Sequence, residues 1–504
     1  MFMNKLCLKL IMLLCLFALL TGLCACGVSL SGAEREALAA EYAKTALSLK
    51  VSDPEELAVL DKYTALESLD LSGSTCYREI EEYIASHPSV DVTYTLPLDS
   101  QGTMIENKAE SVVINSAEQI SSLSENRGSF HDLSSIIISF PDLRAEDLSG
   151  LRSLFPDAGI FFRISPDIPD IPFNAQQADL SALAPEHVDE AADFLKNMPE
   201  LEKVNMTAED GTNLLSFAEL KRLQDAAPGA AFDYRFESFG QTISAADEDI
   251  VYDALSNCVY IYNEGMEQIR EMMPCMTRLK SMFFQYCEID YEVLAQFRAD
   301  FPDVDIVWRV NFGPYSCRTD TERIFANGSL DAASCYNLRY CNKVKYIDLG
   351  HNDYLTSIDF AAFMPDLEIG IFAATSLYDI SPLANCTKLR YLEIFVTNVS
   401  DLSPLANCTE LEQLNVSCCF SLRDLSPLYG LTKLKRVWNT YSSVPQAKRN
   451  EITALMPDCE FCFTRGGSTD YGWRYDNNGN MTEYYAELYE IFGYENFRDN
   501  ISWW

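Results

Sequence analysis

The stretch DISPLANCTKLRYLEIFVTNVSDLSPLANCTEL, residues 379–411, contains the same seven-residue word twice. SPLANCT occupies 381–387 and 403–409, so the two copies begin 22 residues apart. A segment of the form Leu-x-x-Leu-x-Ile or Leu-x-x-Leu-x-Val follows each copy. Alternating apolar positions predict a short strand with one buried face, and the repetition indicates a structural unit that recurs along the chain.

The repeat extends on both sides of this stretch. Strand patterns start at 344, 367, 389, 411 and 434, at intervals of 23, 22, 22 and 23 residues. Ser-Pro-Leu recurs at 381, 403 and 426. Because Pro is tolerated in a first helical turn, we expect a short helical or 3-10 piece to begin there. One such coil cannot bury its own apolar edge, which predicts a stacked array of short repeats over residues 326–464.

This pattern resembles the internalin type of leucine-rich repeat, whose coils continue as Ile-x-Asp-Ile-x-Pro-Leu or Leu-x-Asp-Leu-x-Pro-Leu. The matching segments are LYDISPL at 377–383, VSDLSPL at 399–405 and LRDLSPL at 422–428. The resemblance is specific over 344–440 and loose before 330. It implies an α/β leucine-rich repeat solenoid, with parallel strands on the concave side and helices or 3-10 turns on the convex side.

A longer repeat precedes the short ones. Pro88, Pro156, Pro228 and Pro302 lie 68, 72 and 74 residues apart. Each follows a helix-like stretch and precedes an alternating strand pattern, and another strand pattern lies about 24 residues earlier. Two strands joined by a helix at this spacing predict a right-handed parallel crossover. We therefore expect four degenerate strand-helix-strand units over residues 65–325.

The two ends differ from the repeats. Residues 26–64 are predicted to form an N-terminal helical cap, with a helix from Ala33 to Leu47. Residues 465–504 are rich in aromatic side chains and contain a helix start at Asn480. Since a solenoid needs a cover for its last apolar edge, we expect these residues to form a C-terminal cap.

The first 25 residues have the composition of a bacterial signal peptide. Lys5 and Lys9 precede an apolar run from Leu10 to Leu20, which is too short to span a bilayer. Leu23-Cys24-Ala25-Cys26 resembles the lipobox of bacterial lipoproteins, which implies a lipid on Cys26. The alternatives are a plain cleaved signal and a short membrane anchor. With the repeats, this segment resembles the leucine-rich repeat surface lipoproteins of Gram-positive bacteria and implies the extracytoplasmic face of the cell membrane.

Bulk composition narrows the classes of function. The formal net charge of −37 over 504 residues disfavours binding to nucleic acid. The four histidines, His87, His131, His187 and His351, lie in no recognisable nucleophile motif. We therefore predict no catalytic residues and no cofactor. A hydrolase with its site in the long units is the less favoured alternative.

Two groups of residues match metal sites only in part. Positions 1, 3, 5 and 12 of a calcium loop would be Asp476, Asn478, Asn480 and Glu487. Met481 stands where such a loop needs Gly, and a polar turn before a helix explains the same residues. Cys459 and Cys462 have zinc spacing without a second pair of ligands. No metal site is predicted.

Two cysteines hold equivalent positions in adjacent coils. Cys386 and Cys408 are the sixth residues of the two SPLANCT words. A disulfide between them is geometrically feasible, but buried free thiols are favoured because free Cys is often buried.

The concave face of the short repeats is the predicted binding surface. Side chains that alternate with the inward ones point outward from the inner sheet. Aromatic and arginine side chains dominate binding hot spots, and several occur at these positions. The predicted binding residues are Tyr391, Glu393, Phe395, Gln413, Asn415, Arg436 and Trp438. They suit an extracellular or cell-surface protein partner, with a glycan as the alternative. Whether Trp438 is exposed or covered by the C-terminal segment stays open at this point.

Overall fold

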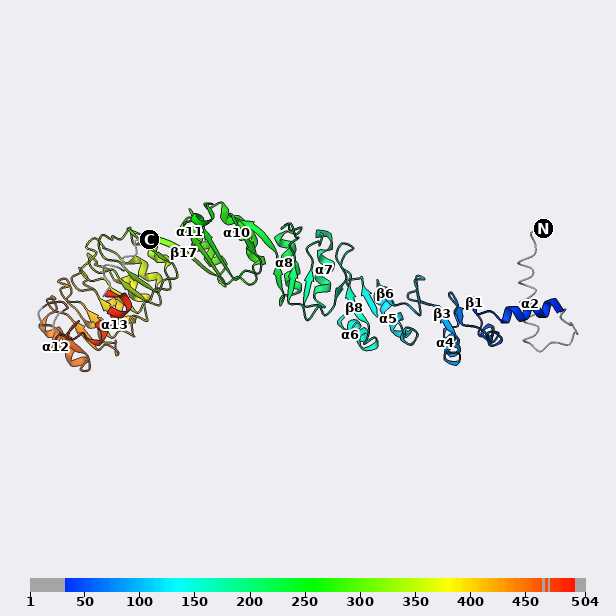
Figure 1. The fold of residues 1–504 in the computed structure, drawn as a ribbon. Helices are drawn as coiled ribbons and strands as arrows, with labels where there is room; N and C mark the ends of the chain where they lie inside the picture. The colour runs from blue at the N-terminus through cyan, green and yellow to red at the C-terminus, as the bar shows by residue number, and fades with distance from the viewer. Residues whose placement is uncertain (1–31, 465–466, 470–471, 495–504) are drawn as a thin grey trace. The chain divides into compact units, whose positions relative to one another are not determined.

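The computed structural model describes residues 32–464, 467–469 and 472–494 (Figure 1). The predicted signal peptide and Cys26 lie outside the described residues. The chain divides into two units, residues 1–232 and 233–504, which are described in turn. None of the helices in the described ranges combines the length and the apolar composition needed to cross a lipid bilayer.

The first unit contains three small parallel sheets. Helix α2 (Gly32–Tyr42) precedes the first sheet, which consists of β1 (Ala46–Ser48), β2 (Ser68–Asp70) and β3 (Asp91–Thr93). The second sheet consists of β6 (Ser111–Ile114), β7 (Ser135–Ile138), β8 (Gly159–Phe162) and the antiparallel β9 (Ile171–Pro172). The third consists of β10 (Gln177–Asp179), β11 (Lys203–Asn205) and β12 (Ala231–Asp233).

Helices and 3-10 segments connect successive strands of these sheets. They are α3 (Pro54–Leu57), η1 (Leu60–Lys62), α4 (Tyr77–Ser86), α5 (Ala117–Glu125), η2 (Arg127–Ser129), α6 (Ala145–Leu154), η3 (Pro185–His187), α7 (Val188–Leu195) and α8 (Phe217–Ala226). An antiparallel hairpin of β4 (Thr95–Pro97) and β5 (Met104–Glu106) follows the first sheet.

The second unit begins with another long repeat. A hairpin of β13 (Arg235–Ser238) and β14 (Gln241–Ser244) precedes a sheet of β15 (Asp249–Asp253), β16 (Ser281–Gln285), β17 (Asp305–Phe312) and the antiparallel β18 (Tyr315–Arg318). Its connections contain α9 (Ala254–Asn257), α10 (Gly265–Met272), η4 (Met273–Cys275) and α11 (Tyr291–Asp300).

Each long unit contains one more parallel strand than the sequence predicts. The additional strands are β1, β6, β10 and β15, which open their units. β10 has three residues and a single buried side chain, so its sequence carries almost no alternating signal, whereas the five residues of β15 do alternate in burial. Residues 46–64 therefore belong to the first repeat and not to the predicted N-terminal cap. Antiparallel strands follow the parallel strands of each unit. They are the hairpin of β4 and β5 in the first unit, β9 in the second, the hairpin of β13 and β14 after the third, and β18 in the fourth.

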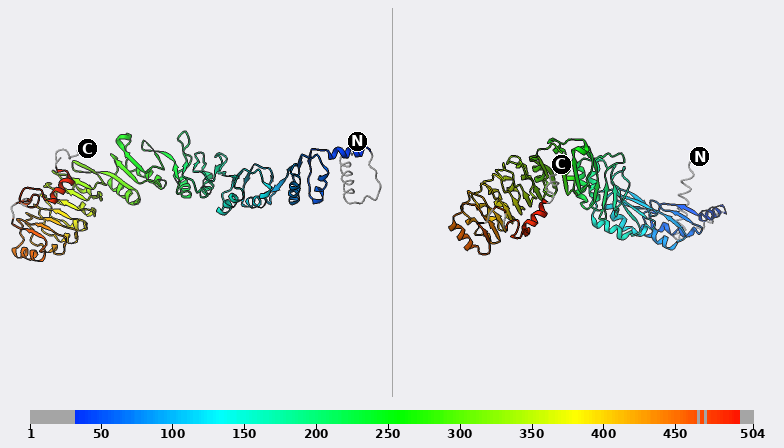
Figure 2. Two further views of the ribbon diagram at one scale, coloured as in Figure 1. Left: turned by 60° about the horizontal axis from the view of Figure 1, so that its bottom comes forward. Right: turned by 60° about the vertical axis from the view of Figure 1, so that its left-hand side comes forward.

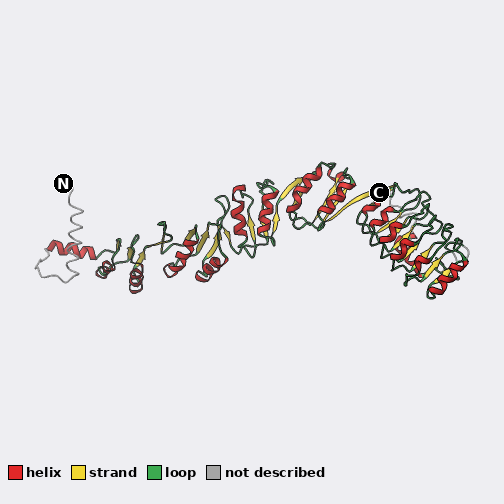
Figure 3. Cartoon of the chain, turned by 180° about the vertical axis from the view of Figure 1, so that it is seen from behind, coloured by secondary structure: helices red, strands yellow, loops and turns green. Residues whose placement is uncertain are grey.

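The short repeats form one parallel sheet of seven strands. In order, these are β19 (Arg323–Phe325), β20 (Tyr346–Asp348), β21 (Ile369–Ile371), β22 (Tyr391–Glu393), β23 (Gln413–Asn415), β24 (Arg436–Trp438) and β25 (Glu460–Cys462). The return segments are η5 (Tyr336–Tyr340), η6 (Asp359–Phe363), η7 (Ser381–Asn385), η8 (Ser403–Asn407), η9 (Ser426–Leu428) and α12 (Gln446–Leu455). Strands line one side and helical segments the other (Figure 3), which confirms the predicted leucine-rich repeat solenoid.

The core of this solenoid is a stack of side chains in matching positions. The central residues of adjacent strands pair in register, and Leu392 lies between Gly370 and Leu414. Both leucines are fully buried. Burial is shared between coils, because a strand of three residues has one inward side chain at its centre.

The repeated Asp-x-Ser-Pro word begins the 3-10 segments η7, η8 and η9. The Asp401 carboxylate accepts hydrogen bonds from the Ser403 backbone N at 2.8 Å and from its Oγ at 2.7 Å. Asp379 and Asp424 accept the same pair of bonds from Ser381 and Ser426. These bonds satisfy backbone donors that a helix start otherwise leaves without partners.

Cys386 and Cys408 are buried free thiols, as the favoured alternative predicts. The Cys386 Sγ donates to the carbonyl oxygen of Ala361 at 3.5 Å, and the Cys408 Sγ donates to that of Leu383 at 3.6 Å. Burial raises the pKa of Cys386 to about 12 and that of Cys408 to about 11. Each thiol therefore joins its coil to the preceding one without a covalent bond.

Replacing Leu392 by Ala should lower the free energy of unfolding of the short repeats by about 3 kcal/mol, because it leaves a cavity between two coils. Urea-induced unfolding of the purified protein measures this loss. Asn398→Ala, an exposed position in the same coil, is the matched control and should change stability by less than about 0.5 kcal/mol. Equal losses in the two variants would contradict the shared core.

Candidate binding surfaces

The structure brings the seven predicted binding residues together. Tyr391, Gln413 and Arg436 form one row across β22, β23 and β24. Glu393, Asn415 and Trp438 form the next row in the same register. Phe395 follows β22 and joins the same buried apolar cluster as Tyr391 and Trp438. The spacing of the repeats was therefore sufficient to place them on one face.

This face is covered by the chain's own C-terminus. Residues 472–494, here called the C-terminal strap, contain Trp473, helix α13 (Glu483–Phe492) and Tyr494. Figure 2 shows α13 alongside the strands of the short repeats. Glu393 and Trp438 are 0% exposed. The alternative in which the C-terminal segment covers Trp438 is thus the correct one, and the seven residues do not form an open surface while the strap is in place.

The strap crosses the strands of the seven-stranded sheet and does not cover the open end of the last coil. Trp473 packs on Trp438 in β24 and on Tyr391 in β22, with ring centroids 5.4 and 5.7 Å apart. At the opposite side of the sheet, Phe492 packs on Phe325 in β19, with a centroid distance of 6.1 Å. The predicted cap therefore covers the concave face, whereas α12 and β25 form the last coil.

A buried carboxylate lies at the centre of this contact. Glu393 accepts hydrogen bonds from the Tyr391 hydroxyl at 2.5 Å and from the Trp473 indole Nε1 at 2.6 Å. The Arg474 guanidinium completes the set at 2.9 Å. Two of the three donors belong to the strap. Since a buried charge is costly without partners, the strap and Glu393 stabilise each other.

Arg436 provides a second polar anchor. It donates to the carbonyl oxygen of Gly472 at 2.6 Å and to that of Trp473 at 3.3 Å. Its guanidinium carbon lies 4.6 Å from the Trp473 ring centroid and 5.2 Å from that of Tyr484. Burial lowers the pKa of Arg436, an effect that nearby tyrosines and carboxylates oppose. Arg436 therefore binds both the backbone and the rings of the strap.

Two further acidic groups, Glu487 and Asp348, fix α13 and Tyr494. Arg390 forms a bidentate ion pair with Glu487 of α13, with one nitrogen–oxygen distance of 3.0 Å. The Tyr494 hydroxyl donates to Asp348 Oδ2 at 2.5 Å, and the Gly350 backbone N donates to Oδ1 at 2.9 Å. Burial raises the pKa of Asp348 to about 6, and these two hydrogen bonds oppose the rise.

Several buried donors in this contact have no hydrogen-bond partner among the described residues. They are Gln413 Nε2, Trp438 Nε1 and Arg474 Nε. The Gln413 Oε1 accepts from Arg436, and the Asn415 Nδ2 donates to the Ser468 carbonyl oxygen at 2.7 Å. The strap thus fits the face well in its apolar contacts and incompletely in its polar ones.

Five large apolar side chains remain exposed in the turns of the short repeats. Tyr354, Tyr378, Val396, Phe420 and Tyr441 are 74%, 64%, 45%, 66% and 58% exposed. They occupy five successive coils, each in the turn between its strand and its return segment. This set of five is called the apolar edge below. The repeat pattern could have revealed it, because these residues lie seven to eleven positions after the start of each coil, where a soluble turn is usually polar.

The turns of the apolar edge are stacked by hydrogen bonds. The Val396 backbone N donates to the Ser417 carbonyl oxygen at 2.9 Å in the next coil. The Ser443 Oγ donates to the Phe420 carbonyl oxygen at 2.6 Å. The backbone φ of Val396 is +54°, and that of Tyr441 is +53°. A β-branched residue is strained in this left-handed region, so the exposed Val396 side chain is not explained by folding stability.

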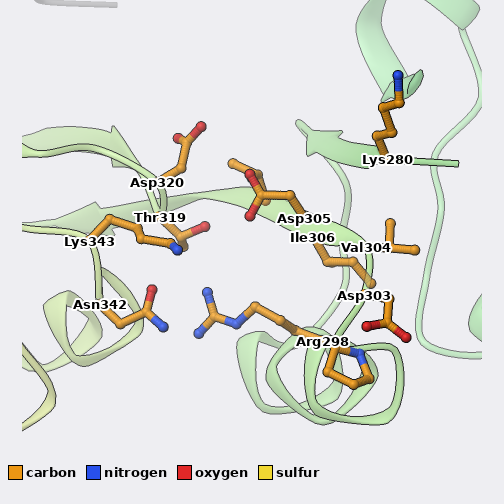
Figure 4. Close-up of a pocket in the computed structure, with 12 residues that line it drawn as sticks. Lys280, Arg298, Asp303, Val304, Asp305, Ile306, Thr319, Asp320, Asn342 and Lys343 are labelled. Carbon is orange, nitrogen blue, oxygen red and sulfur yellow. The ribbon is translucent and has the colours of Figure 1, made fainter. Parts of the chain in front are cut away.

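A cleft beside β17 has no cysteine, histidine or serine among its lining residues. The cleft in Figure 4 has a volume of about 520 Å³ and is lined by acidic and basic side chains. Lys280 pairs with Glu248 at 2.5 Å, and Arg298 lies 4.5 Å from the Trp308 ring centroid. The Thr319 hydroxyl oxygen accepts a hydrogen bond from the Trp308 backbone N. Lys280, Arg298 and Thr319 therefore have partners within the fold, and the apolar side chains of Val304, Ile306 and Val307 also line the cleft.

The residues of the calcium-loop pattern have other roles. Asp476 accepts hydrogen bonds from the backbone N of Asn478 and of Asn480, both at 2.8 Å. Glu487 pairs with Arg390 on the concave face. These contacts are those of a polar turn before a helix, the alternative explanation of the pattern. No group of three or more metal-ligating side chains occurs within the described ranges.

Comparison with known proteins adds little to these observations. No protein-family model matches the sequence, and no curated protein matches it. Among solved structures, an internalin (inlF) from Listeria monocytogenes is similar at 15% identity and a TM-score of 0.25, covering 84% of this chain and 82% of its own. The Leptospira interrogans LRR protein LIC12759 is similar at 13% identity and a TM-score of 0.26, covering 85% and 98%.

These values are too low to carry an argument about function. The class of protein is defined by the chain's own repeats and seven-stranded sheet: it is a leucine-rich repeat solenoid.

The raised pKa of Asp348 predicts a dependence of stability on pH. The covered state binds a proton at about pH 6, whereas an exposed Asp carboxyl does so near 3.8. The stability contribution of Asp348 should therefore increase as the pH falls from 7 to 4, by up to about 3 kcal/mol.

Denaturant unfolding of the wild type and of Asp348→Asn across this pH range measures the effect. The difference between their free energies of unfolding should change with pH, because the variant lacks the titrating group. Parallel pH profiles would show that Asp348 keeps an ordinary pKa.

Proposed function

We propose that the protein is a non-catalytic recognition protein, tethered by a lipid on Cys26 at the extracytoplasmic face of a bacterial membrane. It binds an extracellular or cell-surface protein through the apolar edge of its short repeats. The exposure of three tyrosines, one phenylalanine and one valine in five successive turns is the observation that carries this proposal. Large apolar side chains that are exposed in five successive turns cost solubility, and such side chains are characteristic of binding sites.

The chemistry around the apolar edge indicates the kind of partner surface. Exposed carboxylates of Asp379, Asp401 and Asp424 lie in the same turns or directly after them. Hydrogen bonds from Ser403 and Ser426 lower the pKa of Asp401 and of Asp424, so both are ionised at neutral pH. Aromatic rings beside carboxylates bind lysine and arginine side chains through cation–π contacts and ion pairs. The favoured partner therefore presents a basic, partly apolar protein surface.

A glycan is the second candidate, since aromatic and carboxylate side chains also suit sugars. The two candidates differ in what destroys the ligand. Protease treatment of an extracellular extract removes a protein ligand, whereas periodate oxidation removes a glycan. The proposal expects capture to be lost after protease treatment and retained after periodate.

The double variant Tyr378→Ser/Phe420→Ser should reduce capture of extracellular proteins by the purified chain at least tenfold, because two of the four aromatic side chains of the apolar edge are lost. The matched control is Phe363→Ser/Leu455→Ser, which removes two exposed apolar side chains from the return segments. Quantitative mass spectrometry of the captured proteins measures both. Equal capture by the two variants would show that the apolar edge is not the binding surface.

Lipid anchoring depends on the sequence around Cys26, which resembles a lipobox. The wild type should partition into the detergent phase on Triton X-114 extraction, because multiple acyl chains form a stable anchor. Cys26→Ala should shift the protein to the aqueous phase or leave it with an uncleaved leader. A variant that is cleaved and still enters the detergent phase as the wild type does would refute the anchor.

A further inference from the structure

The C-terminal strap lies on the concave face as a bound peptide lies on a recognition surface. Its Trp473 ring inserts between Trp438, Tyr391 and the Arg436 guanidinium. Trp, Tyr and Arg are the residue types that carry most binding energy at protein interfaces. The core residues of the repeats, by contrast, are mainly aliphatic, such as Leu392 and Leu414. The covered face also contains aliphatic side chains, such as Ile369 and Ile371, but it adds the Trp, Tyr and Arg side chains that are typical of an interface.

End-capping does not account for this arrangement. A terminal cap protects the open end of the last coil, and here the chain reaches that end at β25 and α12. The strap instead runs back over the sheet, and the Arg323 guanidinium in β19 donates to the Ile491 carbonyl oxygen at 2.6 Å. It covers outward-facing side chains, which would be the solvated surface of the sheet without it.

The polar contacts are consistent with the face acting as a receptor and the strap acting as its ligand. The face supplies Glu393 and Arg436, and the strap supplies the Trp473 indole N–H, the Arg474 guanidinium and two backbone carbonyl groups. Without the strap, Glu393 and Arg436 would be charged groups in contact with water, which is an acceptable state for a surface. The two charged groups of the face therefore need the strap's donors and acceptors only while the strap excludes water from them.

Buried donors without hydrogen-bond partners make the contact between the face and the strap less favourable than a fully paired one. Trp438 Nε1 and Gln413 Nε2 lie on the face, and Arg474 Nε lies on the strap, each buried without a hydrogen-bond partner among the described residues. A buried donor without a partner costs roughly 1–3 kcal/mol. This cost lowers the free-energy difference between the covered state and an open one.

We propose that the concave face is a peptide-binding groove, and that the strap is its resident and displaceable ligand. The ligand class is a polypeptide segment with a Trp-Arg pair, in which the indole N–H and the guanidinium both bind Glu393 and the preceding backbone binds Arg436. This proposal is independent of the apolar edge, which lies outside the groove. The covalently attached strap has a high effective concentration, so a free peptide binds only when the strap is weakened or outcompeted.

The test uses the full chain and a fluorescently labelled synthetic peptide of residues 472–494. Trp473→Ala/Arg474→Ala removes the two anchors from the attached strap and leaves the groove unchanged. Fluorescence anisotropy should show that this variant binds the peptide at least tenfold more tightly than the wild type does. The control Asn477→Ala/Glu490→Ala changes two exposed strap residues and should bind as weakly as the wild type.

A third variant assigns the binding to the groove. Adding Glu393→Gln to Trp473→Ala/Arg474→Ala should lower peptide affinity at least tenfold, because Glu393 receives two of the peptide's donors. Circular dichroism and thermal unfolding establish whether each variant is folded.

Three results would overturn the proposal. The first is a folded Trp473→Ala/Arg474→Ala variant that binds the peptide no better than the wild type. The second is equal binding by all variants, which would mean non-specific adhesion. The third is loss of the cooperative fold in that variant, which would make the strap a structural element of the solenoid. None of these results changes what is expected of the apolar-edge variants, so the proposed function is tested independently of this proposal.

Discussion

Each coil of the short repeats can bury its apolar side only against the coil before it and the coil after it. This dependence requires that the strands pair in register, as Leu392 does with Gly370 and Leu414. Once the inward positions match, every other position along the coil is stacked as well. The concave rows through Tyr391 and Glu393 are consequences of the same constraint. A regular period of 22 or 23 residues thus produces long continuous surfaces from short local segments.

The two surfaces produced in this way are in opposite states. The concave rows combine charged and aromatic side chains and are covered by the strap. The apolar edge combines aromatic side chains with ionised carboxylates and is open to solvent. Burial, and not residue type, distinguishes them, since both contain tyrosine and phenylalanine. Trp438 and Arg436 point away from the solenoid core, but this orientation does not make them accessible, because the strap covers them.

The sequence was sufficient for the features that depend on local periodicity. Leu-x-x-Leu-x-Leu patterns and Ser-Pro-Leu words located β20 to β24 and the return segments, and alternation placed Tyr391 and Trp438 on one face. The opening strands of the long units were missed. Gln177–Asp179 has one apolar residue and no alternation, whereas Asp249–Asp253 does alternate in burial and could have been found. The position of the strap was not predictable either. Glu393 and Trp473 are 80 residues apart, and their hydrogen bond depends on tertiary packing that no local pattern records.

The antiparallel strands of the long repeats have a mechanical consequence. At β9 and β18 the parallel hydrogen-bond ladder ends, and the next sheet starts a ladder of its own. Backbone coupling therefore does not pass from one long repeat to the next, in contrast to the seven strands of the short repeats. A pulling force along the chain would therefore act on each interrupted sheet separately. The long repeats would extend stepwise and dissipate load, while the uninterrupted sheet at the far end of the sequence keeps its shape.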